Sequence, residues 1–161
     1  MRTVGPTVNL KTRQLLPQTL SMSAYPKSIF LTPDGGMAWV NFTNSSTLYV
    51  VDTRTLTASG TVNAGGVADT GMAFSPDGTR AYVSVYSTGQ VAVFNTATLV
   101  QIASIPVSGQ PTDIVVSKDG SRAYVNSYAT SGAESVIDLA TNTVVTSLPQ
   151  TGPAMGLTIF H

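Results

Sequence analysis

The sequence contains no cysteine and only one histidine, His161. Without cysteine, the chain cannot form disulfides or thiolate metal sites, and it has no cysteine nucleophile. With one histidine, it cannot build a Ser-His-Asp triad or a histidine-rich metal site by itself. We therefore predict no catalytic residues, no metal site and no cofactor in these 161 residues.

Charged residues are also scarce, at 10% of the chain, whereas they make up about a quarter of an average soluble protein. Eight Lys and Arg balance eight Asp and Glu, so the sequence offers no basic surface for nucleic acid, and we predict no nucleic-acid partner. No apolar run reaches the roughly 20 residues of a membrane span, and residues 1–14 lack the basic-then-apolar pattern of a signal peptide. A surface covered by Thr, Ser and Asn favours an extracellular, periplasmic or cell-surface location.

The most informative feature of the sequence is an internal repeat. Three landmarks recur at spacings of 42 or 43 residues: a turn acid (Asp34, Asp77, Asp119), a strand aromatic (Trp39, Tyr82, Tyr124) and a second turn residue (Asp52, Asn95, Asp138). A period of about 40–45 residues with several short β-runs per unit is typical of one propeller blade per repeat.

The central repeat shows how each unit folds. Its short apolar run Met72–Phe74 ends at the turn Ser75–Gly78, where proline sets the first turn position and glycine accepts a left-handed backbone. Three further strands are predicted, at Arg80–Val85, Val91–Phe94 and Leu99–Ile105. We call the four strands of a unit a, b, c and d.

The repeats resemble the YVTN-type β-propeller repeats. The chain carries TPDG, SPDG and SKDG at residues 32–35, 75–78 and 117–120, followed by AWV, AYV and AYV. The resemblance implies an all-β fold of four-stranded antiparallel blades, with three complete blades plus one split or partial blade. The expected boundaries are a partial blade at 1–24, blades at 25–66, 67–109 and 110–151, and a partial blade at 152–161.

Incomplete end repeats leave three assemblies open. The chain is a segment of a longer propeller of about seven blades, as is usual for the family it resembles, or it assembles with a second copy, or it closes on itself as a four-bladed ring. In each case we expect closure or partner contact at residues 14–22 and 156–160, where strands lack part of their own blade.

The loops between strands b and c and between strands d and a are expected to share one face of the propeller, at the mouth of its channel. A small ligand or a peptide could bind there. The candidate binding residues are Tyr25, Lys27, Asp69, Tyr86, Thr112, Asp113 and Tyr128. Glu134 is expected in a longer b-to-c loop, whereas the strand aromatics Trp39, Tyr82 and Tyr124 are expected to pack between blades.

The sequence supports two classes of function. The first is a non-catalytic binding or interaction module, because the chain offers no nucleophile and base pair. The alternative is part of a propeller enzyme, since the family it resembles is related to lactonases and quinone-dependent dehydrogenase subunits. An enzyme site at the channel mouth would have only Lys27, Asp69 and Asp113 as charged groups.

Overall fold

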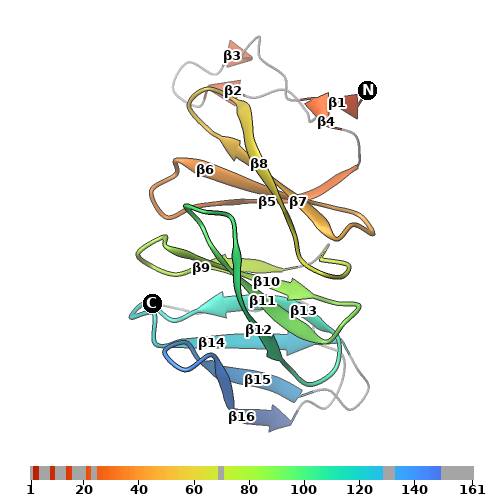
Figure 1. Cartoon of the computed structure of the whole chain (residues 1–161), viewed down its shortest axis with the longest axis vertical. Coiled ribbons are helices and arrows are strands. Elements are labelled where there is room, and N and C mark those ends of the chain that lie inside the picture. The colour runs from red at the N-terminus through yellow and green to blue at the C-terminus, as the bar shows by residue number, and fades with distance from the viewer. Residues whose placement is uncertain are drawn as a thin grey trace.

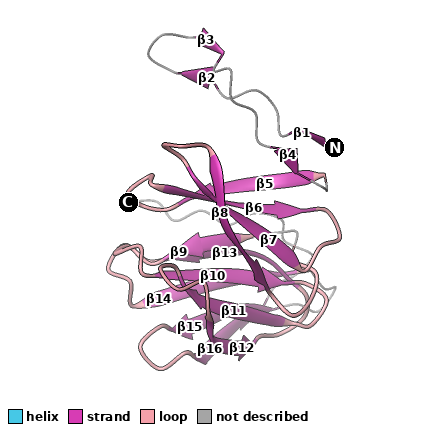
Figure 2. Cartoon of the chain, turned by 45° about the horizontal axis from the view of Figure 1, so that its top comes forward, coloured by secondary structure: helices cyan, strands magenta, loops and turns pink. Residues whose placement is uncertain are grey.

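The computed structural model describes residues 25–68, 71–128 and 133–149, together with four two-residue strands nearer the N-terminus. All of the regular structure in these residues is β-strand, and Figure 2 shows no helix among them. The all-β prediction is therefore confirmed for the described part of the chain. These residues also contain no helix that is long and apolar enough to cross a bilayer.

Three four-stranded antiparallel sheets form the body of the molecule, and each is one blade. The first blade is β5 (Pro26–Leu31), β6 (Met37–Phe42), β7 (Thr47–Asp52) and β8 (Thr57–Asn63). The second is β9 (Met72–Phe74), β10 (Arg80–Val85), β11 (Gln90–Asn95) and β12 (Gln101–Pro106). The third is β13 (Pro111–Val116), β14 (Arg122–Ser127), β15 (Ala133–Asp138) and β16 (Thr143–Pro149). Figure 1 shows the blades stacked along the long axis, with β5–β8 above β9–β12 and the third blade at the bottom.

The hairpin between strands a and b has the same geometry in all three blades. Gly35, Gly78 and Gly120 each have φ of 71°, as predicted from the Asp-Gly turn. Each glycine N–H donates to the carbonyl three residues earlier at 2.8 Å, which closes the turn. Only glycine adopts this left-handed backbone without a steric cost, so the repeated glycine follows from the hairpin itself.

The turn between strands c and d corrects one predicted boundary. Strand d of the second blade begins at Gln101, two residues after the predicted start at Leu99. Leu99 has φ of 59°, and its repeat equivalents Leu56 and Asn142 both have φ of 55°. A residue in the left-handed region cannot continue an extended strand, so this position ends the turn instead.

Apolar side chains fill the boundary between the first and second blades. Trp39 is fully buried there, with ring centroids 5.9 Å from Phe74 and 6.0 Å from Phe94 of the next blade. Burying an indole removes about 150–250 Å² from water, a gain of about 4–6 kcal/mol before the entropic cost of ordering the chain. The packing role predicted for Trp39 is therefore confirmed.

The second boundary repeats this arrangement. Tyr82 occupies the position of Trp39 and is buried in one cluster with Ile114, Val125 and Ile137 of the third blade. Tyr124 has the same place in the third blade but is only half-buried. The repeated aromatic is thus fully buried only where the next blade covers it.

The four short strands form two small pairs, β1 (Arg2–Thr3) with β4 (Ser21–Met22) and β2 (Val8–Asn9) with β3 (Gln14–Leu15). The closing segment predicted at residues 156–160 lies outside the described residues.

Candidate functional site

Each blade has two ends with different connections. We call the end formed by the a-to-b and c-to-d turns the turn end, and the end formed by the b-to-c and d-to-a loops the loop end. Backbone bonds tie the loops of the loop end together: Thr43 N–H donates to the Tyr25 carbonyl at 3.1 Å, and Tyr128 N–H to the Gln110 carbonyl at 2.7 Å. The two sets of loops therefore meet at one end of the blades, as the sequence predicted.

At the turn end, the repeated aspartates of the a-to-b hairpins organise their own turns. Asp77 Oδ1 accepts hydrogen bonds from Ser75 Oγ at 2.6 Å, Thr79 Oγ1 at 2.9 Å and Thr79 N–H at 3.0 Å. The equivalent bonds of Asp119 come from Ser117 and Ser121, and they hold the pKa of this carboxyl at about 2, against an ordinary value of 3.8. These acids are turn residues, as predicted, and they remain ionised at neutral pH.

A second row of turn residues caps the c-to-d turns. Asp52 Oδ1 accepts from the N–H groups of Arg54 and Thr55, both at 2.8 Å. Asn95 makes the same two bonds in the second blade, to Ala97 at 3.0 Å and Thr98 at 2.9 Å. These bonds also lower the pKa of Asp52. The Asp or Asn of each repeat is therefore explained by the local turn.

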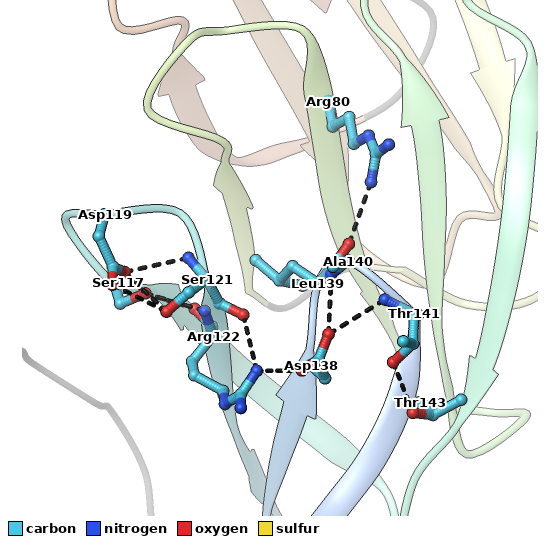
Figure 3. A network of polar contacts seen from close by, with 10 residues as sticks. All are labelled: Arg80, Ser117, Asp119, Ser121, Arg122, Asp138, Leu139, Ala140, Thr141 and Thr143. Carbon is cyan, nitrogen blue, oxygen red and sulfur yellow. Dashed lines mark hydrogen bonds and ion pairs between the residues drawn. The ribbon is translucent and has the colours of Figure 1, made fainter.

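A groove of about 480 Å³, which the repeat pattern did not predict, lies at the turn end between the second and third blades. Arg80 reaches across it, and its Nη1 donates to the Leu139 carbonyl at 3.1 Å, while Arg122 forms an ion pair with Asp138 (Figure 3). Arg80 and Arg122 occupy the same repeat position, which was the sequence signal for this groove. The Arg80 guanidinium therefore binds the neighbouring blade, and the Arg122 guanidinium binds its own blade.

At the loop end, the first blade contributes Tyr25 and Lys27. Tyr25 immediately precedes β5, and 62% of its surface is exposed. Lys27 is the second residue of β5 and is also exposed. Strand a leaves these two side chains at the surface where the chain enters the blade.

The innermost strands of the second and third blades approach each other closely at Thr112 and Asp113. Gly71 N–H donates to the Thr112 carbonyl at 2.7 Å, and a Cβ on Gly71 would lie 2.5 Å from Asp113 Cα. Asp113 Oδ1 accepts from the Ile114 N–H at 2.9 Å, whereas the buried Thr112 Oγ1 has no hydrogen-bond partner in the structure. These two predicted site residues therefore lie together, beside the neighbouring blade.

The two tyrosines after strand b differ in exposure. Tyr86 is half-buried, whereas Tyr128 is 45% exposed. The Tyr128 N–H donates to the Gln110 carbonyl, which places Tyr128 beside the start of β13. Tyr128 thus joins Thr112 and Asp113 at the loop end of the third blade, while Tyr25 and Lys27 belong to the first. Asp69 lies outside the described residues.

One loop assignment is wrong. Glu134 is part of β15 and pairs with Leu148, so it is a half-buried strand residue and not a loop residue. Its repeat equivalents are Leu48 and Val91, both buried between blades. The longer b-to-c connection of this repeat hid the register that places Glu134 on the strand.

Within the described residues, no group of three or more His, Cys, Asp or Glu side chains is placed to hold a metal ion.

Solved structures show the same architecture. The chain is similar to hydrazine synthase from Kuenenia stuttgartiensis, with a TM-score of 0.76 and 26% identity over 85% of this chain and 39% of that one. It is also similar to the dihydro-heme d1 dehydrogenase NirN (TM-score 0.69, 14% identity, 85% of this chain and 30% of that one) and to the WD40 repeats of RRP9 (TM-score 0.70, 12% identity, 80% of this chain and 40% of that one). The fold is that of a β-propeller.

The chain spans less than half the length of these propeller proteins. No family model and no curated protein sequence matches it. The three described blades make up part of a propeller, which other blades or chains complete. The neighbours include enzymes as well as WD40 repeats, so the fold alone does not assign an activity.

Proposed function

We propose that the chain is a binding module within a β-propeller, and that its loop end receives a peptide or a small polar ligand. The observation that carries this proposal is the exposure of Tyr25 and Tyr128, at 62% and 45%, at the loop ends of the first and third blades. Tyrosine offers a large apolar ring and a hydroxyl, which suits it to contact surfaces.

A polar group near the Tyr128 loop supports a ligand with hydrogen-bonding capacity. The Thr112 hydroxyl is buried without a partner, and leaving such a group unpaired costs about 1–3 kcal/mol. Thr112 lies beside Asp113 on the innermost strand of the third blade. It follows Gln110 by two residues, and the Gln110 carbonyl accepts a hydrogen bond from the Tyr128 N–H. A ligand group that satisfies Thr112 Oγ1 would recover part of this cost.

The turn-end carboxylates support a non-catalytic role. A general acid or base works best with a pKa near the operating pH. Hydrogen bonds within the turns lower the pKa values of Asp34, Asp77 and Asp119 from their ordinary value, which makes these carboxyls poor proton donors at neutral pH. These carboxylates accept hydrogen bonds that stabilise the hairpins.

We further propose that the chain is one segment of a larger propeller of the YVTN type, located outside the cell, in the periplasm or at the cell surface. The TPDG, SPDG and SKDG turns with the following AWV and AYV strands support the repeat type. The low content of charged residues, 10% of the chain, supports a location outside the cytoplasm.

Selection of peptides on the full chain tests the binding proposal. Peptides from a random displayed library are selected on the wild-type protein, and their Kd is then measured by fluorescence polarisation on the Tyr25→Ser and Tyr128→Ser variants. We expect each variant to weaken binding about tenfold, equivalent to about 1.4 kcal/mol. The control is Val100→Ser, which changes an exposed apolar residue of the c-to-d turn and should leave Kd unchanged. Equal binding by all variants would remove the loop end as the site.

A second candidate is the propeller part of an enzyme, favoured by the 26% identity to hydrazine synthase. This candidate requires the loop end to hold a reactive cofactor. Hemin and pyrroloquinoline quinone are suitable probes, followed by their absorbance spectra. A stoichiometric spectral change that Tyr25→Ser or Tyr128→Ser abolishes would favour the enzyme over the peptide-binding module.

A further inference from the structure

Two grooves at the turn end are built in the same way, one at each boundary between described blades. Each is bounded by the a-to-b hairpin of one blade and by the a-to-b hairpin and c-to-d turn of the next blade. Each has a volume of about 480 Å³, within the range of roughly 300–1,000 Å³ that small-molecule sites occupy. The two grooves therefore share their construction, and their side chains can be compared directly.

The grooves differ at the first residue of strand b. Met37 lines the groove between the first and second blades, whereas Arg80 lines the groove between the second and third. Arg80 is half-buried, and its Nη1 donates to the Leu139 carbonyl at 3.1 Å. A guanidinium carries several N–H donors, so this one bond leaves most of the group able to bind a ligand. Arg80 therefore brings to the second groove a positive charge that Met37 does not bring to the first.

The residue opposite this position on strand c decides whether the charge is neutralised. Arg122 of the third blade pairs across the strands with Asp138 and forms an ion pair with it. Arg80 pairs instead with Asn95, whose side chain is neutral and caps the c-to-d turn. Within the described residues, the ion pair of Arg122 has no counterpart at Arg80, and Figure 3 shows Arg80 apart from the Arg122–Asp138 pair.

Two further side chains of this groove lie near the Arg80 guanidinium. Burial raises the pKa of Tyr82, and hydrogen bonding and positive charge from Arg80 oppose this rise, so the phenol lies beside the guanidinium. Hydrogen bonding from Ser75 is the main cause that lowers the pKa of Asp77, and the charge of Arg80 adds to it. The hydrogen bonds that Ser75 and Thr79 donate to Asp77 all go to Oδ1, which leaves Oδ2 to accept from a ligand. The groove thus offers a cation, a hydroxyl and a carboxylate.

We propose that the groove between the second and third blades binds a compact zwitterion, such as a free amino acid, with its carboxylate on Arg80 and its ammonium group on Asp77. Charge-assisted hydrogen bonds between a guanidinium and a carboxylate are about twice as strong as neutral ones. A zwitterion matches the groove better than a simple anion, because the ionised Asp77 and Asp119 both line it and repel negative charge. The site lies at the turn end, so the inference goes beyond the ligand proposed for the loop end.

The repeat also predicts which single change closes the site. Among the three described blades, the second combines an arginine on strand b with a neutral residue opposite it on strand c. Asn95→Asp would give Arg80 the partner that Arg122 already has. The new carboxylate would compete with the ligand for the guanidinium while keeping the turn, because Asp52 caps the equivalent turn of the first blade.

NMR titration of the isotope-labelled full chain with glycine tests the proposal. We expect saturable shifts of the Thr79 and Ser121 N–H signals, which report from the two hairpins of the groove. Arg80→Met, which installs the residue of the first groove, should abolish the saturation, and Asn95→Asp should raise the Kd at least about tenfold. Acetate and methylamine each carry one of the two charges of glycine, so each should bind at least about tenfold more weakly.

Transfer of the site to the first groove supplies a gain that a folding defect cannot produce. In the Arg80→Met background, Met37→Arg with Asp52→Asn should restore glycine binding, now reported by the Thr96 N–H of the first groove. Met37→Arg alone should not restore it, because Asp52 lies opposite the new arginine.

Three results would overturn the proposal: no saturable shift up to about 100 mM glycine, unchanged binding in Arg80→Met, or no binding by the transferred site in a folded protein. Acetate binding as tightly as glycine would remove the zwitterion. Tyr128→Ser should leave glycine binding unchanged, so the outcome at this groove is independent of the peptide test at the loop end.

Discussion

The turn end and the loop end of the blades use their side chains in different ways. At the turn end, the repeated Ser or Thr, Asp and Gly of each hairpin form hydrogen bonds with one another. The Arg80 side chain of the second blade also donates a hydrogen bond to the third blade. At the loop end, the backbone joins the loops, while Tyr25 and Tyr128 remain exposed. Residues that repeat faithfully thus stabilise the fold, and residues that vary between repeats are available for contacts.

Among the substitutions at the two ends of the blades, the largest expected effect comes from Gly71, where the innermost strands of the second and third blades lie close together. Gly71→Ala should destabilise the protein by about 3 kcal/mol, because the new Cβ would lie 2.5 Å from Asp113 Cα and 2.9 Å from the Thr112 carbonyl. Urea unfolding measures the loss. Gly35→Ala is the control, since its Cβ would meet nothing within 4 Å and only the positive φ opposes it, at about 1 kcal/mol. Equal losses would mean that the innermost strands separate readily.

The next effect tests the turn end. Gly78→Val should cost about 1–2 kcal/mol, because a β-branched residue resists a φ of 71°. Its Cβ would lie 3.5 Å from Pro33 Cδ, an ordinary contact, so backbone strain is the main cause. Gly78→Asn should lose less, since asparagine tolerates the left-handed region better. An unchanged melting temperature for the valine variant would contradict the hairpin geometry.

A smaller effect appears in acid. The Ser117 hydroxyl and the Ser121 N–H and hydroxyl lower the pKa of Asp119 to about 2, below the ordinary value of 3.8. Because the folded pKa is the lower one, the stabilisation is present above about pH 4 and is lost as the pH falls towards 2. Melting temperatures measured between pH 5 and 2 should therefore decline, and Asp119→Asn should flatten the decline.

Asn95 provides the matched control for this titration. It makes the two N–H contacts that Asp52 makes in the first blade, but its amide does not titrate in this range. Asn95→Asp should steepen the loss of stability in acid. An acid decline that is the same in both variants and in the wild type would show that the turn carboxylates contribute little to the acid transition.

The smallest expected effect lies at the exposed loop end. Tyr128→Ser should change the free energy of unfolding by no more than about 0.5 kcal/mol, since the backbone bond to Gln110 does not need the ring. Tyr82→Ser, at a buried position, should cost about 3–5 kcal/mol. Chemical denaturation of both variants gives the contrast directly, and a large loss for Tyr128→Ser would assign the ring a structural role.

Most of the fold was predictable because the repeat encodes local chemistry. The Asp-Gly turns predicted the positive φ of Gly35, Gly78 and Gly120, and the period predicted that Trp39 and Tyr82 pack between blades. These features depend on a few neighbouring residues or on a position that recurs. The strand predicted at Leu99–Ile105 begins too early, because the turn needs Leu99 in a left-handed conformation.

The site was less predictable, because it depends on contacts between blades. Nothing near Gly71 in the sequence shows that Asp113 of the next blade lies against it. The register of β15, which places Glu134 on a strand, follows from pairing with β16 and was hidden by the longer connection. The half-buried state of Tyr124 depends on which blade follows it, a property that the repeat alone does not specify.

The most direct test of the account separates binding from stability in the same proteins. A peptide selected on the wild-type chain is titrated against Tyr128→Ser and Asp119→Asn, and the melting temperature of each variant is measured at pH 7. We predict that Tyr128→Ser raises Kd about tenfold with an unchanged melting temperature, and that Asp119→Asn lowers the melting temperature with an unchanged Kd. The opposite pattern, with binding lost at the turn end and stability lost at the loop end, would contradict the division between the two ends.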